Sequence, residues 1–157
     1  ILNQKRFEVR INTDFQSVIR YCALPRADGE GTWISEEIIQ AYTELHQSGL
    51  AYSVETYIDN RLAGGLYGVA IGAAFFGESM FHLVSNASKV AFHYLMEILK
   101  NQGFELLDTQ FINENVRRFG ALEIPRSEYI RRLKIALERK CIFTETALEH
   151  LFKEQPA

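Results

Sequence analysis

One stretch limits the possible folds more than any other: residues 64–81, which read GGLYGVAIGAAFFGESMF. It is apolar, glycine-rich and β-prone, and near its end a single acid, Glu78, stands among phenylalanine and methionine neighbours. A second apolar segment, residues 105–111 (ELLDTQF), carries Asp108 and Gln110 in the same way. Core strands rarely carry carboxylates, because burying an unpaired one costs several kcal/mol. These two segments are therefore predicted to form an active site.

The length and composition of the chain indicate one ordinary domain. The chain has 157 residues, of which 47% are hydrophobic and 12% aromatic, enough for one sizeable core. No apolar run is long enough to span a membrane, and the first residues do not resemble a signal peptide. Cys22 and Cys141 lie far apart, which favours free thiols in a reducing cytoplasm. We expect one domain over residues 1–157, and a processed or truncated piece because the chain begins with Ile1.

Hydrophobic periodicity predicts the order of the elements as β-α-α-β-β-β-α-β-α-α. The predicted strands cover residues 5–12, 51–58, 61–71, 73–81 and 104–111. The predicted helices begin near Asp14 and Ser35 and then cover residues 86–101, 113–119 and 126–140. Residues 51–81 form an antiparallel meander, followed by a helix and a strand. This layout indicates an α+β fold, a mainly antiparallel central sheet flanked by helices, as in the GNAT-type acyltransferases.

The meander contains five glycines within fourteen positions, at 64, 65, 68, 72 and 77. Glycine weakens a strand and usually marks a bulge or a close approach of backbone or ligand. We therefore predict that the meander is the floor of a groove that admits a ligand. Strict alternation places Glu78 opposite Phe75, so a pocket lined by both requires a bulge or twist near Gly77.

Positive charge gathers in one part of an acidic chain. The net charge is −3, but residues 117–140 carry eight basic residues against three acids. Such a segment is either a solvated helix face or a local site for a polyanion. Trp33 leaves a similar choice between a core anchor and a platform for a stacked base. Lys89, at the start of the helix over residues 86–101, can hold a phosphate.

Several familiar motifs are absent from the sequence. There is no HExxH, no cluster of Cys and His and no EF-hand loop, so no metal is expected. No Walker loop, GxGxxG or GxSxG occurs either, and we expect no cofactor and no covalent nucleophile. The turn before residue 86 contains no glycine, which argues against coenzyme A.

At several motifs the sequence closely resembles the bacterial leucyl/phenylalanyl-tRNA–protein transferases. The matching pieces run from residue 7 to residue 133 and include GTWI, AYSVE, GGLYGVAIG, FFGESMF, ASK, LLDTQF and GALEIP followed by Tyr129. The resemblance implies transfer of Leu, Phe or Met from a charged tRNA to the N-terminal Arg or Lys of a protein, which marks that protein for degradation. It also implies a GNAT-like domain preceded by a smaller domain, and that smaller domain is expected to be missing here.

The resemblance assigns roles to particular residues. Asp108 polarises Gln110, whose carbonyl oxygen draws a proton from the α-amine of the acceptor. Trp33, Glu78 and Asn113 match positions that bind the substrates. The donor side chain also needs an apolar pocket of Leu or Phe size, and inward residues of the meander are otherwise plain core; the candidates to line this pocket are Leu66, Phe75, Met80, Phe92 and Leu107. The residues expected to bind the tRNA are Arg117, Arg118, Arg126, Arg131, Arg132, Lys134 and Lys89.

Two alternative functions stay open at the level of sequence. A coenzyme A–dependent N-acyltransferase is compatible with the fold. A non-catalytic remnant that binds tRNA or peptide is compatible with the missing domain. The first predicts binding of acetyl-CoA, and the second predicts tRNA binding without turnover.

Overall fold

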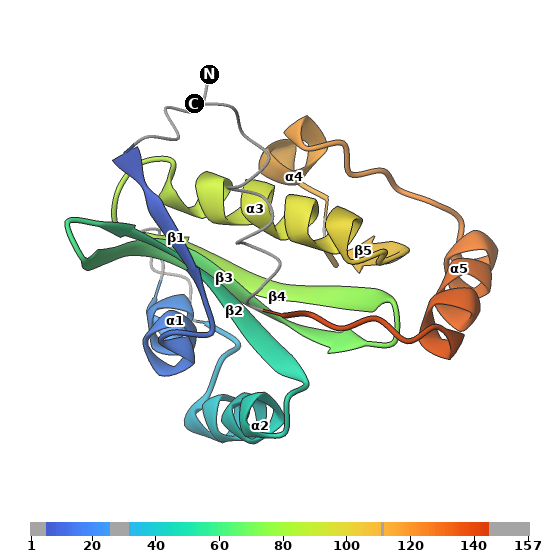
Figure 1. Cartoon of the computed structure of the whole chain (residues 1–157), viewed down its shortest axis with the longest axis horizontal. Helices are drawn as coiled ribbons and strands as arrows, with labels where there is room; N and C mark the ends of the chain where they lie inside the picture. Colours follow the sequence, from blue (N-terminus) through green and yellow to red (C-terminus); the bar gives the residue numbers. More distant parts are fainter. Residues whose placement is uncertain (1–5, 26–31, 111, 145–157) are drawn as a thin grey trace.

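A computed structural model describes residues 6–25, 32–110 and 112–144 of the chain (Figure 1). Within these ranges the elements follow the predicted order, which is thereby confirmed. The strands are β1 (Glu8–Ile11), β2 (Ala51–Ile58), β3 (Arg61–Ile71), β4 (Ala74–His82) and β5 (Leu106–Asp108). The helices are α1 (Phe15–Ala23), α2 (Glu36–Gln47), α3 (Ala87–Asn101), α4 (Glu114–Arg118) and α5 (Arg126–Glu138). In this part of the chain no helix has both the length and the hydrophobicity to cross a membrane.

The five strands form one mixed sheet in the order β1-β2-β3-β4-β5. The first four strands pair antiparallel, while β5 pairs parallel to β4 after the crossover through α3. The pairing of β4 with β5 covers only residues 74–76 of β4. The pairing ends with Phe76 opposite Asp108, the last residue of β5, so the end of this pairing lies beside acidic residues that the sequence singled out.

Local chemistry explains where the helices begin and end. The Asp14 side chain accepts the main-chain N–H of Ser17 at 3.1 Å, and the Ser35 hydroxyl accepts that of Ile38 at 3.3 Å. Both caps satisfy donors that have no partner inside the helix. Gly103, with a φ of 79°, follows the end of α3 as predicted.

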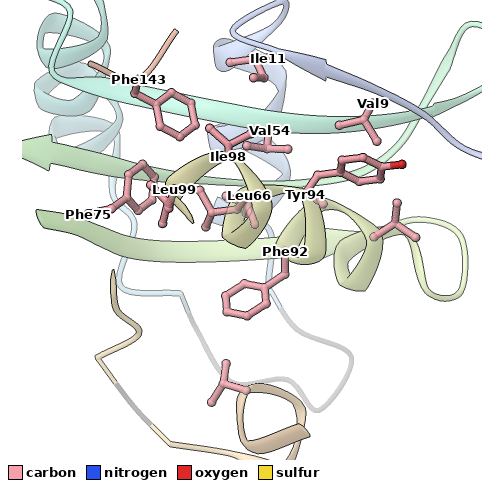
Figure 2. Packing of buried hydrophobic residues seen from close by; sticks show 14 residues of the cluster. Val9, Ile11, Val54, Leu66, Phe75, Phe92, Tyr94, Ile98, Leu99 and Phe143 are labelled. Atoms are coloured by element: carbon pink, nitrogen blue, oxygen red, sulfur yellow. The ribbon is translucent and has the colours of Figure 1, made fainter. Parts of the chain in front are cut away.

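Helices cover both faces of the sheet and make a separate core on each (Figure 1). On one face α3 packs against residues such as Val54, Leu66 and Phe75, and Phe143 closes this core beside Phe75 (Figure 2). On the other face α1 and α2 pack against Tyr67 and other residues of the meander. The sheet is thus buried on both sides.

Four glycines of the meander, at 64, 65, 68 and 72, serve packing within the chain, which corrects the prediction of a ligand groove over them. A Cβ added at Gly64 would lie 2.6 Å from the Cβ of Ala87 at the start of α3. One added at Gly68 would lie 2.4 Å from the Phe75 ring. The missing side chains therefore make room for a helix and an aromatic ring of the same chain. Glycine predicts close approach, but the pattern does not tell whether protein or ligand approaches.

A buried acid, Glu55 on β2, forms hydrogen bonds with the backbone just before α1. Its side chain is fully buried, and it accepts hydrogen bonds from the Ser53 hydroxyl at 2.5 Å and from the main-chain N–H groups of Thr13 and Asp14 at 3.2 Å. Burial raises the pKa of Glu55, while these hydrogen bonds act in the opposite direction. Its oxygens are thus occupied by groups of the fold itself.

Candidate active site

Asp108 and Gln110 are brought together by a turn at the end of β5. One carboxylate oxygen of Asp108, Oδ1, accepts the main-chain N–H of Gln110 at 2.7 Å. Gln110 has a φ of 64°, so the chain bends where the sequence predicted a strand up to residue 111. The predicted proximity of the two residues is confirmed, but its cause is an Asp-stabilised turn and not strand alternation. Phe111 lies outside the described residues.

The Gln110 side chain contacts Glu78 and not Asp108. Its amide Nε2 donates to Glu78 Oε2 at 2.9 Å, although the two residues are 32 positions apart in the sequence. A carboxylate that accepts the amide N–H increases the electron density on the amide oxygen. The side-chain hydrogen bond to Gln110 is thus made by Glu78, whereas Asp108, to which the sequence assigned the polarising role, accepts the Gln110 main-chain N–H.

Glu78 reaches this position because it is the extra residue of a β-bulge. The pairing of β3 with β4 shifts from Tyr67 opposite Ser79 to Gly68 opposite Gly77, which leaves Glu78 without an opposite residue. A bulge near Gly77, which the sequence analysis required for a pocket lined by both Phe75 and Glu78, is thus present, although Phe75 lines neither of the two cavities near the site. A bulge re-aims a side chain and is common beside active sites. Here it lies where β4 no longer pairs with β5.

Tyr129 on α5 completes the surroundings of Asp108. Its hydroxyl donates to Asp108 Oδ2 at 2.6 Å. Burial, followed by the hydrogen bond and the charge of Asp108, raises the pKa of Tyr129 to about 12. The hydroxyl is thus protonated at neutral pH and acts as a donor. In the sequence Tyr129 was singled out only as part of the matching motifs, so its contact with Asp108 was not predicted.

A second tyrosine stands close to Glu78. Burial, followed by the charge of Glu78 and a hydrogen bond to it, raises the pKa of Tyr42 on α2 to about 12. Each of the two carboxylates therefore has a neutral tyrosine hydroxyl as a neighbour. The helical periodicity that begins near Ser35 places Tyr42 on the inward face of its helix, but it does not show which residue Tyr42 meets.

An open groove of about 800 Å³ runs beside these groups. Its wall includes Asp108, Gln110 and Tyr129 together with apolar side chains from α3, β5 and the segment after α4. A small hollow of about 20 Å³ lies nearby, lined by residues that include Met80, Lys89 and Phe92. In the described part of the chain, no three His, Cys, Asp or Glu side chains lie together as metal ligands would.

Comparison with known proteins identifies the family. The sequence pattern of the family described as "Leucyl/phenylalanyl-tRNA protein transferase" matches residues 1–134. The chain belongs to this family. A relative named leucyl/phenylalanyl-tRNA–protein transferase from Gloeobacter violaceus is 55% identical over 143 residues, covering 91% of this chain and 72% of the relative. One of the same name from Prosthecochloris aestuarii is 56% identical over 137 residues, covering 87% and 71%.

Solved structures confirm the GNAT-like fold. A ribosomal-protein-alanine N-acetyltransferase from Brucella melitensis superposes with a TM-score of 0.52 at 9% identity and covers 74% of this chain and 92% of its own. The aminoglycoside N-acetyltransferase AAC(6')-Iy, in complex with CoA, gives a TM-score of 0.53 at 14% identity, with coverage of 76% and 90%. At such low identity these likenesses show the fold alone.

The residues predicted to line an amino-acid pocket separate into two groups. Phe92 and Leu107 line the groove, and Met80 with Phe92 lines the small hollow. Leu66 is only 2% exposed and Phe75 is fully buried, and both belong to the core under α3 (Figure 2). The structure thus does not place these two on either cavity, because α3 and Phe143 cover that part of the sheet.

Two other predicted substrate contacts, Trp33 and Asn113, are not among the described residues that line the groove or the small hollow. Trp33 is 51% exposed just before α2, which favours the stacking platform over the core anchor. The Asn113 side chain caps α4 by accepting the main-chain N–H of Val116 at 3.1 Å. Asn86, before Lys89, has a φ of 70° and makes no side-chain capping bond to α3. The role of each of these residues in binding stays a prediction.

The predicted tRNA-binding arginines and lysine of α4 and α5 are exposed, but acids neutralise part of their charge. Arg131 and Arg132 both bind Glu128, at 2.6 Å and 2.8 Å, and together they lower the pKa of Glu128 to about 2. Arg118 pairs with Glu114 at 3.6 Å. Among the described residues, Arg117, Arg126 and Lys134 make no ion pair; Arg126 and Arg132 line the groove with Tyr129.

Proposed function

We propose that this protein is an aminoacyltransferase that moves Leu or Phe, and also Met, from aminoacyl-tRNA to the N-terminal Arg or Lys of an acceptor protein, which marks that protein for degradation. Family membership supports this proposal, and the observation that carries it is the contact of Glu78 with Gln110 beside the groove. The reaction takes place in the cytoplasm, where charged tRNA is available.

The proposed chemistry requires no covalent intermediate, because the aminoacyl ester is already activated. The amine nitrogen of the acceptor attacks the ester carbon, a peptide bond forms, and the bond to the ribose oxygen of the tRNA breaks. One amine proton is lost as the bond forms, and the departing ribose oxygen gains a proton. No net oxidation, reduction or metal is involved, and no cofactor enters the balance.

Gln110 is the group that we assign to the amine proton. Its Nε2 is engaged by Glu78, so its Oε1 is the end of the amide that can accept a hydrogen bond from the amine. Asp108 fixes the turn that carries Gln110. Much of the acceleration then comes from holding amine and ester in the correct geometry, which alone can contribute about 7–11 kcal/mol.

The surfaces around the site suit the two substrates. Phe92, Leu107 and Met80 offer apolar contacts for a Leu, Phe or Met side chain, which such a wall separates by only about 1–3 kcal/mol per methylene. The exposed ring of Trp33 can stack on a base of the tRNA. The basic residues of α4 and α5 can bind the acceptor stem through its phosphates, with an affinity that falls as salt rises.

The direct test is transfer of radiolabelled Phe from Phe-tRNA to a protein that begins with Arg. We expect incorporation of label, and no incorporation when the acceptor begins with an acidic residue. The Gloeobacter violaceus relative, assayed in parallel, is the positive control. Binding of tRNA without transfer would instead support the non-catalytic remnant. Calorimetric binding of acetyl-CoA would support the coenzyme A–dependent alternative.

A further inference from the structure

Asp108 is the end of a chain of contacts that begins on α5. The Tyr129 hydroxyl donates to one oxygen of the Asp108 carboxylate, at 2.6 Å, and the Gln110 main chain donates to the other, at 2.7 Å. Both oxygens are thus engaged by the protein itself. A carboxylate held in this way is better suited to fixing its neighbours than to binding substrate.

The turn held by Asp108 needs such support. Gln110 has a positive φ of 64°, a conformation that residues other than glycine adopt at an energetic cost. The Asp108 carboxylate compensates by accepting the Gln110 N–H. The Tyr129 hydroxyl, on a different element, donates to the second oxygen of the same carboxylate and so restrains its orientation.

Helix α5 is independently attached to the sheet, so it can serve as a fixed support. The main-chain N–H of Ala73 donates to the Ala136 carbonyl at 2.8 Å, and Arg139 pairs with Glu105 next to β5. Tyr129 lies nearer the start of the same helix, three residues from both Arg126 and Arg132. All three side chains line the groove.

We propose that Tyr129 is a positioning residue of the transfer reaction: it acts through Asp108 to hold Gln110 in place and does not itself touch the substrate. This inference rests on the proposed function, since it names the support of the same site. It also connects the basic helix that we assign to the tRNA with the group that we assign to the amine proton.

The first test replaces Tyr129 by Phe, which removes the hydroxyl and keeps the ring. Because hydrogen bonds to charged groups are strong, we expect kcat for Phe transfer to fall about 10- to 100-fold. The KM values for Phe-tRNA and for the acceptor should stay within about twofold. Tyr52→Phe is the matched control, because it too removes one tyrosine hydroxyl that donates a hydrogen bond. The acceptor in this case is the backbone carbonyl of Gly49, away from the groove. It should leave kcat unchanged.

Two results would overturn the inference. One is a kcat for Tyr129→Phe within about twofold of the wild type. The other is a loss confined to KM for the tRNA, which would make Tyr129 a substrate contact. Circular dichroism and the melting temperature of each variant separate these results from a failure to fold.

A second test checks the contact between Tyr129 and Asp108 directly, without an activity assay and without the Tyr129→Phe variant. Tyrosine labelled with ¹³C at Cζ reports the ionisation of each hydroxyl by NMR. In the wild type the pKa of Tyr129 should be raised to about 12, and in Asp108→Asn its signal should titrate at a lower pH, because the hydrogen bond and the charge of Asp108 are gone while burial, the largest cause, remains. An unchanged titration would refute the contact. Absence of Phe transfer by the wild type would refute the proposed function instead.

Discussion

Two carboxylates of the same sheet, on strands that lie either side of β3, differ sharply in what surrounds them. Glu55 on β2 is fully buried, and its oxygens accept from Ser53 and from the main chain at the start of α1. Glu78 on β4 lies at a bulge, is partly exposed and binds a side-chain amide from the end of β5. The first acid joins parts of the fold, while the second meets a group beside an open groove.

The difference shows which property of an acid in an apolar strand indicates function. The residue type alone does not, because both strands contain glutamate. What matters is whether the oxygens are saturated by the backbone of the fold or contact a side chain that borders a cavity. By this criterion Asp108 is intermediate, because it lies at the groove but binds the protein through both oxygens.

The largest expected effect is on stability, from Glu55→Ala. The change leaves the Thr13 and Asp14 N–H groups without their acceptor and opens a small void, so unfolding free energy should fall by about 3 kcal/mol. Urea unfolding measures it, and Glu138→Ala, at an exposed site on α5, is the control. If Glu55→Ala instead lowers transfer per folded molecule, the proposed division between the two acids is wrong.

The next effect is on catalysis, from Asp108→Asn. An amide at this position cannot accept equally well from both Gln110 and Tyr129, so we expect kcat to fall roughly 100-fold with little loss of stability. Asp59→Asn in the turn between β2 and β3 is the matched control, because Asn also tolerates the positive φ there. Equal activity of the two variants would remove Asp108 from the site.

A smaller effect is expected from Glu78→Gln, which keeps an acceptor for Gln110 but removes the charge. We expect kcat for Phe transfer to fall about tenfold, since a hydrogen bond to a charged group is about twice as strong as a neutral one. Glu97→Gln on α3 serves as the control. A larger loss for Glu78→Gln than for Asp108→Asn would reverse the order of importance of these two acids.

The smallest effect is the pH dependence contributed by Glu55. Its pKa is raised in the folded state from the ordinary 4.5, so the folded protein binds more protons and the wild type loses stability as pH rises above about 4.5. Glu55→Gln cannot ionise. The free energy of unfolding should be measured in urea at about pH 4.5 and about pH 7. Between the lower and the higher pH, the stability of the variant should rise relative to that of the wild type. The opposite trend would mean that the hydrogen bonds of Glu55 outweigh its burial.

The sequence predicted the order of the elements because each has a clear periodicity or cap. The turn at Gln110 was not predicted, since alternation was extended past Asp108 and nothing local marks a positive φ at a glutamine. The contacts of Tyr42 and Tyr129 were also beyond prediction, because inward positions on two helices do not show which strand residue they meet.

The sequence predicted which residues form the candidate site better than it predicted the hydrogen bonds between them. Glu78, Asp108 and Gln110 do lie together, yet the Gln110 amide binds Glu78. Leu66 and Phe75 were assigned to a pocket because apolar strand residues suit both a pocket and a core. Only the covering helix α3 decides between the two, and that packing is a tertiary property.

The bulge at Glu78 changes the alternation of side chains along β4, so that odd-numbered residues face opposite sides of the sheet before and after it. Before it, odd-numbered Phe75 faces the core under α3; after it, odd-numbered Phe81 faces the core under α1 and α2 and stacks on Tyr21. One extra residue thus lets a single strand supply an aromatic ring to each core. If the alternation were regular along the whole of β4, Phe81 would lie on the face that α3 covers, as Phe75 does. The position of the acid and the integrity of both cores therefore depend on the same bulge.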